Sequence, residues 1–215
     1  MSDDLAELRR EYARAELTRD HVTDDPIAQF RAWFEEAQNA EVPEPNAMTL
    51  ATAAPDDAPS ARIVLLKGVD QRGFRFYTNY DSRKGTELDQ NPHAALVFWW
   101  PPLERQVRIE GTVERLPDDE STAYFRSRPR GSQLGAWASP QSRVVESREV
   151  LEKNLAEVKA EYEDTPIPRP AQWGGYVVRP TQIEFWQGRP NRLHDRLRYR
   201  RSAPRDRWTL ERLAP

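Results

Sequence analysis

The sequence IEFWQGRPNRLHDR, residues 183–196, predicts a strand, a turn and a second strand. Because side chains alternate between the two faces of a strand, Arg192, His194 and Arg196 are expected to share one face. Two guanidinium groups and an imidazole beside the indole of Trp186 suit a planar, phosphorylated ligand. Any one of these residues fits a solvated edge strand equally well, but the whole group predicts an anion site.

Length and charge limit the class of protein. A chain of 215 residues is enough for one substantial domain or two small ones. Its net charge of −3 argues against a general nucleic-acid or membrane-surface binder, so anion recognition must be local. The absence of cysteine excludes disulfides, and three widely spaced histidines argue against a metal site. The charged N-terminal residues and the lack of a long apolar run predict a cytoplasmic protein.

Hydrophobic periodicity predicts a mainly β protein with peripheral helices, of the α+β class. A polar helix is expected over residues 4–17, and Asp25-Pro26 begins an apolar helix that packs on a core. Further helices are expected at 118–127 and 148–162, the latter with Leu151, Leu155 and Val158 inward, and residues 135–143 as a loop. Eight or so strands indicate one antiparallel barrel or sandwich. The segments with strand patterns are MTLATA (48–53), SARIVLLKGV (60–69), GFRFYTN (73–79), HAALVFWW (93–100), RQVRIEGTVERL (105–116), WGGYVVR (173–179), QIEFWQ (182–187), RLHDRLRYRR (192–201) and RWTLERL (207–213).

Two cations bracket the apolar run of the second predicted strand. Arg62 and Lys67 are five residues apart, so in a regular strand they point to opposite faces. They cannot then hold the same small anion unless a bulge intervenes. Either one of them has no binding role, or the chain has two anion sites.

Two further segments carry phosphate-binding patterns. Ser82 is a suitable N-cap with Arg83 and Lys84 in the first helical turn, where cations are unfavourable unless an anion binds. A solvated Arg-Lys pair is the alternative. Tyr124 and Arg128 are spaced i, i+4 with Ser132 just beyond, which fits a phosphate monoester and an ordinary surface about equally.

The inventory of cations points towards two phosphorylated ligands. No glycine-rich phosphate loop and no nucleophile elbow is present, so phosphate binding must rest on side chains. The candidates are too many for one monoester: Arg62, Lys67, Arg83, Lys84, Arg128, Arg192 and Arg196. An enzyme that holds a phosphorylated cofactor against a phosphorylated substrate fits this excess. With no metal and no nucleophile candidate, the cofactor would carry out the chemistry.

Six motifs together resemble the pyridoxamine (pyridoxine) 5′-phosphate oxidase family. They are IEFWQGRPNRLHDR, RIVLLK, FYTNYDSRKG, ERQVRIEG, YFRSRPRGSQLGAW and the closing RLAP, and they keep the family's order and spacing over nearly the whole chain. The resemblance implies an antiparallel FMN-binding split β-barrel and a homodimer with FMN at the subunit interface. It also implies oxidation of pyridoxamine 5′-phosphate or pyridoxine 5′-phosphate to pyridoxal 5′-phosphate, with O₂ as the electron acceptor and H₂O₂ as a product.

The resemblance also implies which residues bind. The FMN set is Arg62, Ile63, Val64, Leu65, Leu66, Lys67, Tyr77, Thr78, Arg83, Lys84, Gln106, Gln141, Ser142, Trp186 and Arg196. The substrate set is Lys67, Tyr124, Arg128 and Ser132 around the phosphate, Arg192, Leu193 and His194 over the ring, and Arg9 and Tyr12 as a mobile cover. Residues 1–20 are thus expected as a mobile helical segment and 21–215 as a single domain. Glu44 departs from the family pattern and receives no role.

The implied mechanism is hydride transfer from substrate C4′ to flavin N5. Arg192 and His194 are the expected catalytic residues, with Arg192 pinning the ring and His194 forming a hydrogen bond to the substrate. A related flavin oxidase with another substrate and a non-catalytic carrier of flavin or pyridoxal phosphate are the alternatives. A nucleic-acid binder, suggested by the basic residues of 192–201, is disfavoured by the acidic net charge.

Overall fold

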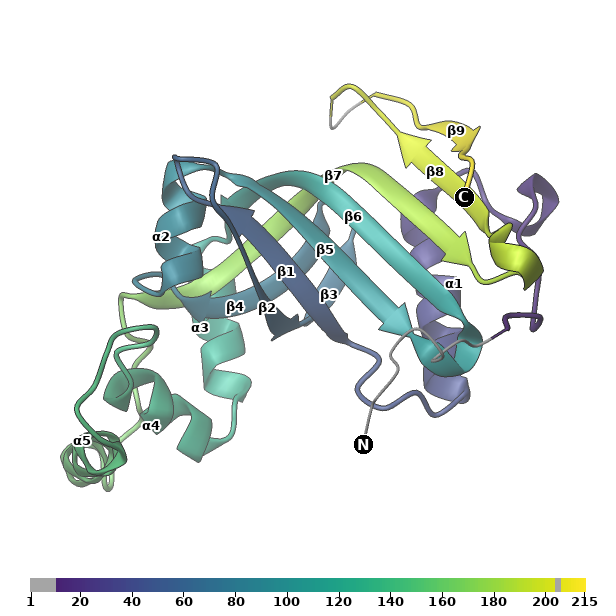
Figure 1. The fold of residues 1–215 in the computed structure, drawn as a ribbon. Coiled ribbons are helices and arrows are strands. Elements are labelled where there is room, and N and C mark those ends of the chain that lie inside the picture. The colour runs from purple at the N-terminus through teal and green to yellow at the C-terminus, as the bar shows by residue number, and fades with distance from the viewer. Residues whose placement is uncertain (1–10, 204–205) are drawn as a thin grey trace, which may run out of the picture. The chain divides into compact units, whose positions relative to one another are not determined.

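The computed structural model describes residues 11–203 and 206–215, and over this part of the chain nine strands form one antiparallel sheet (Figure 1). The strands are β1 (Ala47–Ala53), β2 (Pro59–Leu65), β3 (Gly68–Asp70), β4 (Gly73–Asn79), β5 (His93–Trp100), β6 (Arg105–Arg115), β7 (Trp173–Gln187), β8 (Asp195–Arg200) and β9 (Thr209–Arg212). Their order is β2-β1-β5-β6-β7-β4-β3, with β8 paired to β7 and β9 to β8. The expected mainly β fold with peripheral helices is therefore confirmed.

Five α-helices accompany the sheet in the described residues. They are α1 (Pro26–Asn39), α2 (Arg83–Gln90), α3 (Asp118–Ser127), α4 (Arg130–Ala138) and α5 (Arg148–Glu161). Short 3₁₀ turns are η2 (Arg19–His21), η3 (Pro101–Leu103) and η4 (Pro190–Arg192). None of the helices in the described ranges has the length and apolar character that crossing a membrane would require.

The chain divides into two compact units. Unit 1 contains the chain up to Thr49, Ala95–Glu110 and Pro180–Pro215, and unit 2 contains Leu50–Ala94 and Gly111–Arg179. Strands β1, β5, β6 and β7 each contribute residues to both units.

The core of unit 1 forms around α1, as its periodicity predicts. Asp25 caps the helix, because its carboxylate accepts a hydrogen bond from the Ile27 amide at 2.9 Å. Phe30 packs against Phe98 of β5 at 5.1 Å between ring centroids, and Trp33 meets Phe185 of β7 edge-on at 5.1 Å. These aromatic contacts fix α1 against the part of the sheet that carries the 183–196 stretch.

The core of unit 2 forms where α3 and α4 meet the start of β7. Phe125, Leu134, Ile167 and Trp173 form a buried cluster. Leu155 is 40% exposed on α5, and that helix has no buried residue, so the expected inward face of α5 is wrong at this position. The helix packs on α4 rather than burying a full apolar stripe.

Strand β7 joins two segments that the sequence predicts as separate strands. WGGYVVR and QIEFWQ form one strand of 15 residues that runs through Pro180. The β4 ladder along β7 ends at Val178 and the β8 ladder begins at Gln182. The missing amide of Pro180 therefore falls where β7 changes partner, the position at which a strand tolerates proline.

The second predicted strand is instead divided. SARIVLLKGV separates into β2 and β3 around Leu66 and Lys67, and the Lys67 amide donates to the Arg75 carbonyl of β4 at 2.8 Å. Residues 60–69 therefore serve two different partners. The premise that Arg62 and Lys67 lie on one regular strand is wrong.

The N-terminal segment is not helical over residues 11–17, in contrast to the helix expected at 4–17. Side chains distant in sequence bind its backbone: Glu104 accepts from the amides of Ala13 and Arg14, and Asp195 accepts from the amide of Leu17. A polar segment with a thin apolar stripe gains more from these contacts than from an isolated helix. The segment 135–138, expected as a loop, is the end of α4.

Candidate functional site

Unit 2 contains a cavity of about 600 Å³ that gathers most of the expected binding residues. Its lining consists of Arg62, Ile63, Val64, Leu65, Lys67, Tyr77, Thr78, Lys84, Tyr124, Arg128, Pro129, Ser132, Gln141 and Trp173. Only Pro129 and Trp173 are additions to the residues singled out from the sequence. A buried aromatic beside Tyr77 and Tyr124 carries no sequence pattern that marks it as a site residue.

The break between β2 and β3 explains how both bracketing cations reach this cavity. Arg62 precedes the break and Lys67 follows it, and both line the cavity despite their odd spacing. Leu66 lies between them and is buried in the core instead. The expectation that Arg62 and Lys67 face opposite sides is therefore wrong, because both residues line the same cavity.

Helix α2 starts as predicted, with Ser82 as its N-cap. The Ser82 hydroxyl accepts from the Gly85 amide at 3.4 Å, and Gly85 is required because a Cβ would lie 2.0 Å from the Tyr80 carbonyl oxygen. Lys84 is buried and its ammonium group donates to Thr78 Oγ1 at 3.2 Å. Burial, followed by the nearby Arg62 charge, lowers the pKa of Lys84. Bound negative charge would oppose both effects.

Arg128 is the clearest open donor in the cavity. Its guanidinium group lies 4.5 Å from the centroid of the Trp173 ring, and burial lowers its pKa. Its Nη1 atom is buried and has no hydrogen-bond partner among the described residues. Tyr124 stacks on Tyr77 at 3.8 Å between centroids, and both tyrosines line the same cavity as Arg128. A half-buried guanidinium whose buried Nη1 has an unused N–H fits an anionic group of a ligand.

Of the other FMN-set residues of unit 2, Gln141 lines the cavity, whereas Arg83 and Ser142 do not. Gln141 Oε1 accepts from Thr78 Oγ1 at 3.2 Å and from the Asn79 amide at 3.4 Å. Ser142 has a left-handed backbone with φ of 70°, and the Arg83 side chain is 62% exposed.

A separate cavity of about 720 Å³ in unit 2 also contains arginines, Arg126, Arg130 and Arg169. Arg130 donates to the backbone carbonyls of Tyr162, Glu163 and Thr165. Arg169 is paired with Asp118 at 2.5 Å. Arg130 and Arg169 thus already bind protein groups, the carbonyls after α5 and the Asp118 carboxylate at the start of α3. This cavity is therefore a weaker anion site than the one around Arg128.

Unit 1 carries the residues of the 183–196 stretch. Trp186 and Arg196 are directly opposite each other in the β7–β8 ladder. Arg196 forms a two-pronged ion pair with buried Glu184, at 2.8 and 3.1 Å, which raises the pKa of the arginine. Glu184 was not singled out from the sequence as a site residue. The sequence signal that could have identified Glu184 is its position two residues before Trp186, on the same face of the strand.

The alternation predicted for residues 192–196 does not hold before Asp195. Arg192 belongs to η4 with a left-handed φ of 60°, and Leu193 follows it as an exposed residue. His194 is presented by this turn, and its ring lies 4.6 Å from that of Trp186. The turn forms because Asn191 and Arg192 both adopt left-handed backbone conformations, which a regular strand cannot contain.

The protonation of His194 follows from its contacts. Its Nδ1 accepts a hydrogen bond from the Arg189 amide at 3.1 Å, so the neutral ring carries its proton on Nε2. Burial, and then the charge of Arg192, lowers the pKa of His194. The neutral imidazole therefore offers an N–H donor at Nε2.

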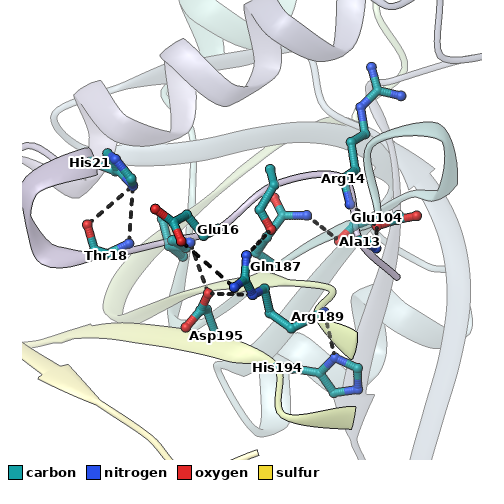
Figure 2. Close-up of polar contacts among 12 residues, drawn as sticks. Ala13, Arg14, Glu16, Thr18, His21, Glu104, Gln187, Arg189, His194 and Asp195 are labelled. Atoms are coloured by element: carbon teal, nitrogen blue, oxygen red, sulfur yellow. Dashed lines mark hydrogen bonds and ion pairs between the residues drawn. The ribbon is translucent and has the colours of Figure 1, made fainter. Parts of the chain in front are cut away.

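The N-terminal segment brings Tyr12 to the same residues. The Tyr12 ring meets Trp186 at 5.8 Å and His194 at 5.9 Å, and it packs so closely over Gly188 that a Cβ there would lie 2.7 Å from its Cγ. Figure 2 shows polar contacts of the residues that follow Tyr12. The amides of Ala13 and Arg14 each donate a hydrogen bond to the Glu104 carboxylate at 3.1 Å. Arg9 lies outside the described residues.

Gln106, the remaining member of the FMN set, is half-buried near the start of β6. The structure thus divides the expected site residues between the two units. Unit 1 holds Tyr12, Gln106, Trp186, Arg192, Leu193, His194 and Arg196, and unit 2 holds the phosphate-binding candidates around Arg128.

Comparisons with known proteins agree with these features. A family model described as pyridoxamine 5′-phosphate oxidase matches residues 34–162, and one described as the pyridoxine 5′-phosphate oxidase C-terminal dimerisation region matches residues 173–215. A protein of Salinibacter ruber named pyridoxine/pyridoxamine 5′-phosphate oxidase is 79% identical, covering 98% of this chain and 99% of its own. A protein of the same name from Rubrobacter xylanophilus is 62% identical, covering 99% and 97%.

Solved structures show the same fold. PhzG from Burkholderia lata, solved with tetrahydrophenazine-1-carboxylic acid, matches with a TM-score of 0.86 and 33% identity over 93% of this chain and 98% of its own. A pyridoxamine 5′-phosphate oxidase-related FMN-binding protein from Nostoc punctiforme matches in fold, with a TM-score of 0.69 and 19% identity over 90% and 100%. The sequence matches, supported by these structural ones, place the chain in the pyridoxamine 5′-phosphate oxidase family.

Proposed function

We propose that the protein is a cytoplasmic, FMN-dependent oxidase that converts pyridoxamine 5′-phosphate and pyridoxine 5′-phosphate to pyridoxal 5′-phosphate. O₂ would be the electron acceptor, giving H₂O₂, and the amine substrate would also release ammonia. Family membership and the printed names of the relatives at 79% and 62% identity support this activity. The family and the fold it shares with a flavin-binding protein support FMN as the cofactor.

The observation that carries the proposal is the cation-rich cavity of unit 2. It collects Arg62, Lys67, Lys84 and Arg128, and it contains a buried guanidinium nitrogen of Arg128 without a partner among the described residues. Lys84 is buried and Arg62 and Arg128 are half-buried, and gathering four cations in one cavity is unfavourable unless anions join them. Two phosphate-bearing ligands meet this requirement, one as cofactor and one as substrate.

The resemblance to the family divides the residues between the two ligands. We assign Arg62, Arg83 and Lys84 to the FMN phosphate, and Lys67, Tyr124, Arg128 and Ser132 to the substrate phosphate. The remaining FMN contacts would come from Ile63, Val64, Leu65, Tyr77, Thr78, Gln106, Gln141, Ser142, Trp186 and Arg196; Leu66, expected among them, is buried in the core. Bound FMN would supply the hydride acceptor for the hydrogen on substrate C4′, with O₂ restoring its oxidised form.

Around the substrate ring, the protein contributes orientation and electrostatics. Neutral His194 can donate a hydrogen bond from Nε2, because its Nδ1 is occupied by the Arg189 amide. We assign His194 to holding the ring rather than to obligatory proton removal. Arg192, on the adjoining turn, would fix the ring so that the C4′ hydrogen is correctly placed. Arg9, Tyr12 and Leu193 would cover this end.

We propose a homodimer with FMN at the subunit interface. The family model for the C-terminal dimerisation region matches residues 173–215. This range contains Trp186, Arg192, His194 and Arg196, so an interface built from it would carry site residues. The dimer proposal and the site assignment therefore support each other.

A related flavin oxidase with a different substrate is the second candidate. Its support is the structural match to PhzG, a protein solved with a phenazine carboxylic acid. The 33% identity of that match is well below the 79% of the first relative named above. The clustering of Lys67, Tyr124, Arg128 and Ser132 in one cavity also favours a phosphorylated substrate.

The test is an anaerobic titration of the FMN-loaded protein with pyridoxamine 5′-phosphate, followed by visible flavin absorbance. We expect bleaching that reverses when air is admitted. A flavin that binds but bleaches with neither phosphorylated substrate would contradict the proposed activity. Unphosphorylated pyridoxine serves as the control, and it should react poorly because it leaves Lys67 and Arg128 without an anion.

A further inference from the structure

Glu87 of α2 is a buried carboxylate that contacts Arg62 and Arg83 in unit 2. The residue is 5% exposed. Its Oε2 atom accepts from Thr52 Oγ1 at 2.5 Å, from Ser60 Oγ at 2.6 Å and from Arg62 Nη2 at 3.2 Å. Its Oε1 atom accepts from Arg83 Nε at 2.8 Å. One carboxylate thus binds both arginines assigned above to the FMN phosphate.

The carboxylate stays charged over the physiological pH range. Burial alone would raise its pKa, but hydrogen bonds from Ser60, Thr52, Arg83 and Arg62 outweigh burial and lower the pKa of Glu87 to about 2. The arginine contacts are therefore permanent charge-assisted hydrogen bonds.

Glu87 and its neighbours orient Arg62 from several directions. The Nη1 atom of Arg62 donates to Thr52 Oγ1 and to the Leu50 carbonyl, and the Nη2 atom donates to Ser60 as well as to Glu87. The guanidinium plane is therefore held in place by the protein itself. A planar donor that is oriented in advance loses little entropy when it meets a phosphate.

Charge attraction by itself does not account for this arrangement. A carboxylate beside a phosphate site reduces the positive charge that attracts the anion. Glu87 therefore lowers the electrostatic attraction and at the same time fixes the geometry of Arg62 and Arg83. The gain from fixed geometry has to exceed the loss of charge for the site to favour phosphate.

We infer that Glu87 is a positioning residue for the phosphate group of FMN, acting through Arg62 and Arg83. This inference rests on the proposed function, because it takes the FMN phosphate as the ligand of these two arginines. It adds a residue whose effect should be specific to the phosphate end of the flavin.

The chain contains a matched control, Glu120 on α3. Its carboxylate also binds two arginines, Arg72 at 2.7 Å and Arg75 at 3.7 Å. None of these three residues lines the cavity around Arg128. Glu120→Gln therefore removes a similar carboxylate–arginine cluster in the same unit without touching the proposed phosphate site.

The experiment compares FMN with riboflavin, which lacks the phosphate. The apoprotein is titrated with each flavin and the quenching of flavin fluorescence gives both Kd values for wild type, Glu87→Gln, Glu87→Asp and Glu120→Gln. We expect Glu87→Gln to weaken FMN binding by about tenfold or more, the size of one lost charge-assisted hydrogen bond. Riboflavin binding should change by less than about twofold on the same reasoning.

The other variants separate positioning from stability. Glu87→Asp keeps the charge but shortens the reach, so it should fall between wild type and Glu87→Gln. It also serves as the test variant if Glu87→Gln does not fold. Glu120→Gln should leave the ratio of the two Kd values unchanged even if it lowers Tm.

Two negative outcomes are distinguishable. If wild type binds FMN no better than riboflavin, the phosphate assignment under the proposed function is wrong. If wild type prefers FMN and the Glu87 variants keep that preference, or Glu120→Gln loses it equally, only the role of Glu87 is overturned.

Discussion

Two arginines of the candidate site, one in each unit, have opposite environments. Arg128 in unit 2 is half-buried, has a buried Nη1 atom with no hydrogen-bond partner among the described residues, and has a lowered pKa. Arg196 in unit 1 is bound at two points by Glu184 and has a raised pKa. Residue type alone does not distinguish a cation that awaits an anion from one that already has an acid. The surrounding side chains make that distinction.

The contrast predicts a division of work between the two units. Residues of unit 2 with open donors should supply the affinity for phosphate. Residues of unit 1, already organised by Glu184, the η4 turn and the N-terminal segment, should supply orientation. Variants in the two units should therefore change different kinetic parameters.

The largest effect should come from Arg128→Leu. Removing the half-buried guanidinium leaves the substrate phosphate without a principal donor. Two charge-assisted hydrogen bonds correspond to about a 100- to 1,000-fold loss in kcat/KM. Steady-state kinetics with pyridoxamine 5′-phosphate measures this loss. Unphosphorylated pyridoxamine is the control and should be nearly unaffected. A loss below about threefold with the phosphorylated substrate would contradict the assignment.

The acid stability of unit 2 should depend on Glu87. Its pKa is about 2 in the folded protein against an ordinary value of 4.5, so its contribution is present above pH 4.5 and is lost as pH falls towards 2. A shift of this size corresponds to on the order of 3 kcal/mol. Urea unfolding of the apoprotein between these pH values should show a shallower loss for Glu87→Gln than for wild type. Parallel curves would show that the carboxylate is not held as described.

In unit 1, Arg192→Leu should reduce kcat rather than FMN affinity. Loss of one orienting cation over the substrate ring is expected to lower kcat by about 30-fold, equivalent to about 2 kcal/mol. Anaerobic stopped-flow measurement of flavin bleaching gives the rate, and fluorescence titration gives the FMN Kd. Wild-type turnover and substrate affinity in this variant would remove Arg192 from the site.

The smallest effect should come from Glu104→Gln, which weakens the acceptor for the Ala13 and Arg14 amides. We expect a rise in KM of about three- to tenfold, the equivalent of about 1 kcal/mol, and faster tryptic cleavage after Arg14. Glu16→Gln is the control, because the ion pair between Glu16 and Arg189 is long, at 3.8 Å. Equal cleavage rates in the two variants would show that Glu104 does not hold the segment.

Local sequence patterns predicted the elements whose causes are local. The caps Asp25 and Ser82 mark the starts of α1 and α2, and the bounds of α3 agree with residues 118–127. A cap requires only a side chain and an amide two or three residues away, so it can be recognised in a short stretch. The cations and hydroxyl groups of unit 2 were found in the same way, from short stretches, whereas Tyr77, Thr78, Gln141 and Ser142 entered through the resemblance to the family.

Tertiary structure decided the features that depend on distant partners. Strand alternation failed at Lys67 because β2 and β3 pair with different strands. It failed at Arg192 because that residue belongs to η4, before β8 begins. The segment 11–17 does not form the predicted helix, because its backbone amides donate to the carboxylates of Glu104 and Asp195 instead. These competing contacts lie 90 or more residues away in the chain, beyond the range of any local pattern.

The sequence by itself determined the mainly antiparallel class, the helix starts, and the set of cations and aromatics that resembles one oxidase family. Only the tertiary structure decided which of those cations share a cavity and which are neutralised. Glu87 and Glu184 illustrate the reason: each carboxylate selects its arginine through folding, over 25 and 12 positions respectively. Charge balance in a buried site depends on spatial neighbours, and the fold chooses those neighbours.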